Sequence, residues 1–166
     1  KLEARWNEPS ARYRCYAHHA HPVNFNLGKI QGGEWASSVP SACRSDIRIG
    51  FYPGMRVAQA KAEVEAVLAA AHAAHPAHES LSYRIVYEGF QAEGCEVDLN
   101  EPVVTTLSKC HADIVGKALE PQAFTGTTDA KFFNLYGNTP AICYGPAGSS
   151  IHGIDEWVSI DSMMEV

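Results

Sequence analysis

The chain has 166 residues, enough for one compact domain or for a small domain with part of another. Hydrophobic residues make up 46% of it and charged residues 19%, which is typical of ordered globular proteins and excludes an intrinsically disordered chain. The net charge is -6, no basic stripe is present and no apolar run is long enough to cross a bilayer, so neither a nucleic acid nor a membrane is an expected partner.

The first part of the chain predicts alternating helices and strands. The predicted elements are the end of a helix at 1–7, strands at 22–30 and 43–51, a helix at 55–74 and a strand at 81–90. Apolar and polar residues alternate in the strands, and in the long helix apolar residues recur every three or four positions. With one more strand before the first helix, this order predicts an α+β sandwich, in which two helices cover one face of an antiparallel sheet.

The pattern changes after about residue 92. Asn100 is expected to cap a helix that has Pro102 in its first turn. Residues 120–166 predict short pieces of strand, helix and loop without sheet partners of their own. We therefore divide the chain into 1–92 and 93–166, and expect each part to belong to something larger.

His152 is the first candidate for a functional residue. It lies in a loop rich in glycine and serine and is followed by two acids, Asp155 and Glu156. A neutral imidazole on such a loop can bind zinc, and a nearby carboxylate can orient its ring. The alternative is a histidine on a surface loop with no ligand.

Two further positions could contact an anionic substrate. The loop from Gly126 to Asp129 precedes an apolar helix, whose first N–H groups could bind a carboxylate or could simply be capped by Thr128 or Asp129. Arg48 lies beside Asp46 on the polar face of a strand, where it could bind a carboxylate or form a solvated ion pair.

The other histidines and the cysteines give weaker signals. Three histidines lie close together near residue 20, and of these His19 and His21 could chelate a metal or could simply be exposed side chains. The five cysteines are irregularly spaced and include no CxxC pair. We predict that they are reduced and mostly buried in a cytoplasmic protein.

Several motifs occur in an order typical of one enzyme family. The run HPVNFNLGKIQGGEWASSVPSACRSDIRIGFYPG, at residues 21–54, resembles the lid, or dimerisation, domain of the acetylornithine deacetylase and succinyl-diaminopimelate desuccinylase family. The run GTTDAKFFNLYGNTPAICYGP, followed by IHGIDEWVSI, is similar to the closing catalytic segment of that family. It contains a Gly-Thr-Thr-Asp turn, a strand that ends in Tyr-Gly-Pro, and then the histidine that completes the family's metal site.

The resemblance implies a two-zinc amidohydrolase or metallopeptidase, with cobalt as a possible replacement for zinc. In such an enzyme a bridging hydroxide attacks an amide carbonyl and a glutamate acts as the general base. The resemblance implies His152 as a metal ligand and Arg48, Gly126 and Thr127 as residues that bind the substrate. It implies that an early HxD motif, a bridging aspartate and a pair of glutamates complete the site, and we expect no catalytic residue in this chain.

The resemblance also implies an assignment for each part of the chain. Residues 1–92 would be an incomplete ferredoxin-like two-layer sandwich, the lid domain without its first strand. Residues 93–166 would be the C-terminal segment of an α/β zinc-hydrolase catalytic domain. A homodimer formed through the lid domain is the expected assembly.

Two functions from different classes follow. The first is a fragment of a two-zinc amide hydrolase for an N-acyl amino acid or a related small amide, inactive on its own. The alternative is a non-catalytic dimerisation or binding module, because an exposed sheet edge can pair with a second copy. A third possibility is a metal binder that uses His19 and His21.

Overall fold

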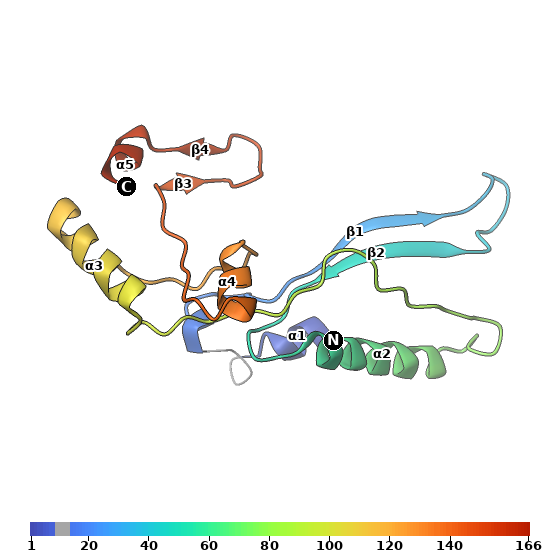
Figure 1. Cartoon of the computed structure of the whole chain (residues 1–166). Helices are drawn as coiled ribbons and strands as arrows, with labels where there is room; N and C mark the ends of the chain where they lie inside the picture. The colour runs from blue at the N-terminus through green and yellow to red at the C-terminus, as the bar shows by residue number, and fades with distance from the viewer. Residues whose placement is uncertain (9–13) are drawn as a thin grey trace. The chain divides into compact units, whose positions relative to one another are not determined.

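The computed structural model describes residues 1–8 and 14–166, and the chain forms two compact units, Lys1–Gly94 and Cys95–Val166 (Figure 1). Helices and antiparallel strands occur in both units, as an α+β chain requires. In the first unit the elements are α1 (Leu2–Trp6), a 3-10 turn (Arg14–Tyr16), β1 (Phe25–Gly32), β2 (Cys43–Ile49) and α2 (Val57–Ala73). In the second unit they are α3 (Pro102–Val115), α4 (Ala130–Tyr136), β3 (Gly148–Ser149), β4 (Trp157–Val158) and α5 (Ile160–Glu165).

Strands β1 and β2 form an antiparallel hairpin with one apolar and one polar face. Phe25 lies opposite Ile49 and Leu27 opposite Ile47, and a bulge between Leu27 and Lys29 then shifts the register. Because side chains alternate between the faces of a strand, the extra residue at the bulge returns Ile30 to the apolar face. The predicted alternation of apolar and polar residues is thus present in both strands.

The core of the first unit lies at the base of this hairpin. Leu2 and Trp6 of α1, Ala60 of α2, Val23 and Tyr52 are buried together there. Both helices lie on the same side of the hairpin (Figure 1). The indole of Trp6 meets the ring of Phe25 edge to face, with 5.4 Å between the ring centroids.

Polar side chains of α1 also bind the chain that leads into β1. The Asn7 side chain accepts a hydrogen bond from the Val23 N–H and donates one to the Val23 carbonyl, as a neighbouring strand would. The Glu3 carboxylate accepts hydrogen bonds from the Phe25 N–H and from His21 Nε2, each at 3.0 Å. These contacts fix the position of α1 against the start of β1.

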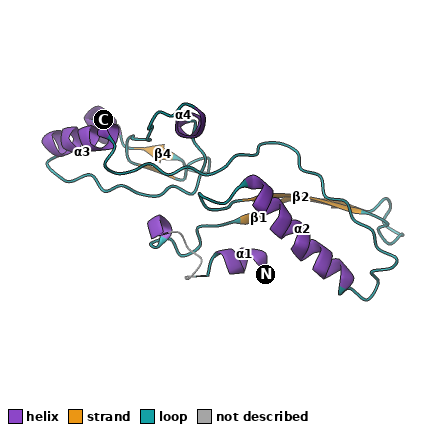
Figure 2. Cartoon of the chain, turned by 60° about the horizontal axis from the view of Figure 1, so that its bottom comes forward, coloured by secondary structure: helices purple, strands orange, loops and turns teal. Residues whose placement is uncertain are grey.

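The strand predicted at 81–90 is absent from the structure. This stretch is extended but pairs with no strand in the described part of the chain, and Figure 2 draws the chain after α2 as loop. Tyr87 contacts α2, where its hydroxyl donates to the Lys61 carbonyl and the Lys61 ammonium lies 4.5 Å from its ring centroid, and Glu88 lies 3.8 Å from Arg44 of β2. A strand is stable only when a partner strand takes up its backbone groups, and alternation alone cannot supply that partner.

The helix predicted near Asn100 begins one position later than expected. Pro102 is its first residue and Glu101 occupies the N-cap position, without a side-chain cap. The side chain of Asn100 instead donates a hydrogen bond to Asp98, in the turn that precedes α3. The prediction of Asn100 as the helix cap is therefore wrong, while Pro102 lies in the first turn as predicted.

All five cysteines are free thiols, but the prediction that most of them are buried is wrong. Cys43, Cys110 and Cys143 are exposed, and the other two are partly exposed. They lie outside the small core at the base of the hairpin. Among the described residues, no helix is long and apolar enough to cross a bilayer.

Candidate functional site

His152 lies in the loop that joins β3 and β4. The hairpin has only two residue pairs, Gly148 with Val158 and Ser149 with Trp157. Within the loop, the Gly153 N–H donates to the Ser150 carbonyl at 2.6 Å and closes a tight turn around His152. An added Cβ at Gly148 would lie 2.8 Å from the Trp157 carbonyl oxygen, so a glycine is needed for the strands to approach this closely.

The backbone of this loop is unusual. His152 has a φ of 62°, and Ser150 and Asp155 on either side of it both have a φ of 58°. Residues other than glycine seldom adopt this left-handed region, although histidine and aspartate do so more often than most. The side chain of His152 is exposed. The structure thus presents an accessible imidazole on a loop of defined conformation, as a metal ligand requires.

Gly126 and Thr127 lie in the same unit as His152, in an exposed turn just before α4. An added Cβ at Gly126 would collide with the ring of Phe124, although that ring is the end of a movable side chain. Asp129 occupies the N-cap position of α4, but its side chain makes no capping hydrogen bond. The carboxylate of Asp129 therefore accepts no hydrogen bond from the first N–H groups of α4.

Two side chains that sequence reasoning missed hold the segment between α4 and β3. The Asn134 side chain accepts from the Ala141 N–H at 2.9 Å and donates to the Ala141 carbonyl at 2.8 Å. Further along, His111 of α3 hydrogen-bonds the Tyr144 hydroxyl through Nδ1 at 2.8 Å. A polar residue within the apolar run KFFNLY was the signal that could have revealed Asn134.

Arg48 lies on β2 in the first unit, opposite Asn26 on the polar face of the hairpin. Its guanidinium is exposed and makes none of the ion pairs found among the described residues. Asp46, the acid beside it in sequence, pairs with Arg44 instead, which also lies 3.8 Å from Glu88. These acids raise the pKa of Arg44, chiefly through the hydrogen bond to Asp46. Arg48 thus remains available for an external carboxylate.

The histidines near residue 20 do not form a metal site. His21 binds Glu3, while the rings of His18 and His19 lie against each other with centroids 4.2 Å apart. More generally, the described part of the chain contains no group of three or more histidine, cysteine, aspartate or glutamate side chains that could hold a metal ion. His152 is therefore a single candidate ligand, and the described residues do not by themselves fit a two-metal centre.

One tripeptide in the second unit has the HxD form. His111, Ala112 and Asp113 match it, but they lie within α3. Residues two apart on a helix point to different sides, so this histidine and this aspartate cannot chelate one metal ion together. The hydrogen bond from His111 to Tyr144 gives the histidine a structural partner instead.

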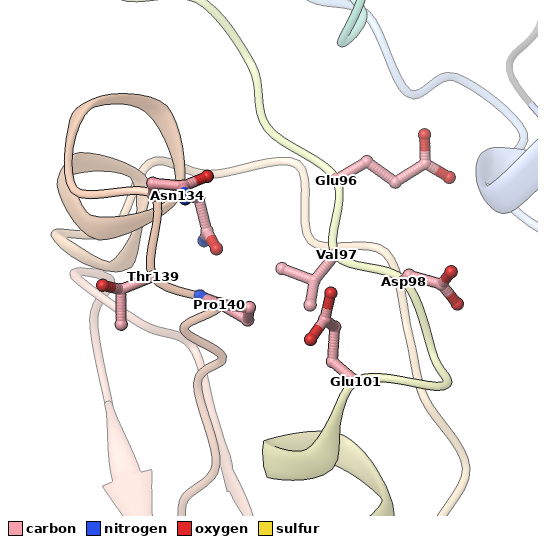
Figure 3. Close-up of a pocket in the computed structure, with 8 residues that line it drawn as sticks. Glu96, Val97, Asp98, Glu101, Asn134, Thr139 and Pro140 are labelled. Carbon is pink, nitrogen blue, oxygen red and sulfur yellow. The ribbon is translucent and has the colours of Figure 1, made fainter.

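The second unit also has a pocket of about 400 Å³, between the chain before α3 and the end of α4 (Figure 3). Three acids contribute to its wall: Glu96, Asp98 and Glu101. The carboxylates do not converge, because Asp98 is bound to Asn100 and Glu96 points away from Asn134 and Pro140 (Figure 3). The pocket contains none of the residues predicted to bind metal or substrate.

Comparison with known protein families explains the order of these motifs. The model of peptidase family M20/M25/M40 matches residues 14–166, which is most of the chain. The chain belongs to this family. Members of this hydrolase family are generally metal-dependent.

Succinyl-diaminopimelate desuccinylases from two strains of Caulobacter vibrioides are similar to this M20-family chain. Each is 26% identical to it over 146 residues, which is 87% of the chain and 36% of the relative's length. The chain thus spans about a third of the length of these relatives. The predicted resemblance to the acetylornithine deacetylase and succinyl-diaminopimelate desuccinylase family is confirmed.

Proposed function

We propose that this chain is part of a metal-dependent amide hydrolase that acts on an N-acyl amino acid or a related small amide. The observation that carries the proposal is the family match, which extends over His152 and the loop that presents it. The similar desuccinylases are named for the removal of an acyl group from an amino acid. In this proposal His152 binds one of two divalent ions, zinc or cobalt, in a cytoplasmic enzyme.

Each unit, taken by itself, offers groups that would bind a substrate anion. An arginine can form two parallel hydrogen bonds to a substrate carboxylate, and within the described ranges 1–8 and 14–166 Arg48 pairs with no acid that would compete. Gly126 and Thr127 lie in the exposed turn before α4, and a substrate anion would contact them there. Residues 1–92 would then be an incomplete, ferredoxin-like lid domain that forms a homodimer. Residues 93–166 would be the end of the catalytic domain.

The proposal assigns no catalytic residue to this chain. A two-metal centre needs several ligands, and the described residues offer His152 and no cluster around it. The remaining ligands would come from residues that correspond to the part of the relatives outside the matched region. We therefore expect residues 1–166 by themselves to hydrolyse no amide.

The test is an amidase assay on the complete protein that the gene encodes. N-succinyl and N-acetyl amino acids are offered after metal removal and after addition of Zn²⁺ or Co²⁺. Activity that returns with metal, is lost in His152→Ala and falls mainly through KM in Arg48→Ala supports the proposal. Full metal-dependent activity in His152→Ala contradicts it.

A non-catalytic dimerisation module is the second candidate, and one observation favours it. Leu27, Ile30 and Ile47 share the apolar face of the hairpin but are 54%, 67% and 53% exposed. Neighbouring exposed apolar side chains of this kind mark surfaces that become covered in an assembly. Both candidates predict a dimer, so the amidase assay on the complete protein discriminates between them. A complete protein that forms a dimer in sedimentation velocity, dissociates in Ile30→Lys and hydrolyses none of the amides favours the module.

A further inference from the structure

The base of the β3–β4 hairpin is fixed by two serines from the start of α5. The backbone of Ala147, the residue before β3, has a partner on both sides. Its carbonyl accepts from the Ser159 N–H at 2.8 Å, and its N–H donates to Ser162 Oγ at 2.9 Å. The serines also bind each other, because the Ser162 hydroxyl donates to the Ser159 carbonyl and the Ser162 N–H donates to Ser159 Oγ.

The hydroxyl of Ser162 accepts the hydrogen bond that a strand carbonyl would otherwise accept. Strand β4 ends at Val158 and the chain turns into α5, so β4 offers no carbonyl to the Ala147 N–H. The Ser162 hydroxyl takes that place from the first turn of the helix. Ser159 serves at the same time as the N-cap of α5, so the helix start and the hairpin base form one hydrogen-bonded network.

Little else in the described structure holds this hairpin in shape. Its ladder has only two residue pairs, and an isolated two-stranded hairpin is marginally stable. None of the residues of α5 is buried, so the helix makes no apolar core with the hairpin. The loop that carries His152 therefore depends on the serine network more than on packing.

We propose that Ser162 is a positioning residue that fixes the conformation of the His152 loop. Its hydroxyl acts through Ala147, five residues before His152, and touches no ligand itself. Only one consequence of this role rests on the proposed function: if His152 binds a metal, a loop that already orients the histidine makes that binding tighter. The loop order itself is independent of any metal.

The first arm of the test measures loop order in the 166-residue chain by amide hydrogen exchange. In Ser162→Ala, the Ala147 N–H loses its acceptor, and its exchange rises about tenfold, as loss of one hydrogen bond predicts. The Gly153 N–H, which closes the turn around His152, exchanges faster as well. Ser162→Thr keeps the hydroxyl and restores both rates.

Ser108→Ala is the matched control. Ser108 lies in the same unit, is also partly buried, and donates its hydroxyl hydrogen bond within α3, to the Val104 carbonyl at 2.8 Å. Its replacement leaves the exchange of Ala147 and Gly153 unchanged. Gly148→Ala serves as a positive control, because its added Cβ would separate the two strands.

The second arm measures Zn²⁺ affinity in the complete protein. Ser162→Ala weakens binding about 10–100-fold, the range for loss of a residue that orients a ligand, and Ser162→Thr restores it. Unchanged exchange at Ala147 and Gly153 in Ser162→Ala overturns the inference, as does an equal change in Ser108→Ala. Metal affinity that does not respond to His152→Ala contradicts the proposed function instead, and the exchange rates still decide the role of Ser162.

Discussion

Single side chains carry much of the specificity of this small structure. Glu3 of α1 and Asn7, the residue that follows α1, bind the backbone of Phe25 and Val23, and so provide hydrogen bonds to groups at the edge of the sheet. Glu63 of α2 accepts hydrogen bonds from Arg5 and from the indole of Trp6. Burial raises the pKa of Glu63, but the hydrogen bonds from Trp6, Gln59 and Arg5 outweigh that effect and the pKa is lowered.

Glu3 makes the stability of the first unit depend on pH. The hydrogen bonds with His21 and the Phe25 N–H hold its pKa below the ordinary value of 4.5. The unfolded chain then binds the proton more tightly than the folded chain does, so stability falls as the pH falls through the lowered pKa. Above pH 4.5 the contribution is complete, and for a partly exposed pair it is about 1 kcal/mol or less.

We therefore predict that Glu3→Gln loses less stability between pH 5 and pH 3 than the unchanged chain. Urea unfolding followed by tryptophan fluorescence checks this, because Trp6 is buried while the other two tryptophans are exposed. Glu79→Gln is the control, because Glu79 is exposed. Identical acid profiles for Glu3→Gln and the unchanged chain would refute the prediction.

At the scale of elements, contacts between helices and extended segments decide the order of the second unit. Asn134 joins α4 to Ala141, and the Tyr144 hydroxyl joins the same segment to His111 of α3. The segment forms no strand ladder, so these side chains take the place of a neighbouring strand. They connect the turn at Gly126 with the stretch that leads to His152.

Asn134→Ala should destabilise the second unit by about 1–3 kcal/mol, because it removes the partner of both the Ala141 N–H and the Ala141 carbonyl. Thermal unfolding followed by circular dichroism measures the loss. Asn26→Ala, on the exposed polar face of β1, should change stability by no more than about 0.5 kcal/mol. Equal effects of the two variants would show that the contacts of Asn134 do not stabilise the unit.

At the scale of the whole molecule, the elements with strong local signals were predictable from the sequence. The strands β1 and β2 and the helices α2 and α3 have periodic apolar residues, and each lies within a few residues of its predicted range. The strand at 81–90 was predicted wrongly because strand formation depends on a partner elsewhere in the chain. The prediction of Asn100 as a cap failed because the helix begins one residue later, with Glu101 at the N-cap position, while Asn100 lies in the preceding turn and donates to Asp98.

The candidate site was also predictable only in part. The sequence places a histidine in a loop rich in glycine and serine, and the family motifs indicated His152, Arg48, Gly126 and Thr127 as candidates. Their roles stay predictions. Ser162 could not be found by spacing alone, because its role depends on the fold of α5 back onto Ala147.

The most direct test of the central claim is the metal content and Zn²⁺ affinity of the complete protein with and without His152. Loss of a residue that only orients a ligand weakens metal binding about 10–100-fold. We predict that His152→Ala weakens Zn²⁺ binding by more than this. His111→Ala, the matched histidine in the HxD tripeptide of α3, should leave metal binding unchanged because it pairs with Tyr144. Unchanged zinc affinity in His152→Ala, or a larger loss in His111→Ala, would contradict the assignment of His152 as the metal ligand of this chain.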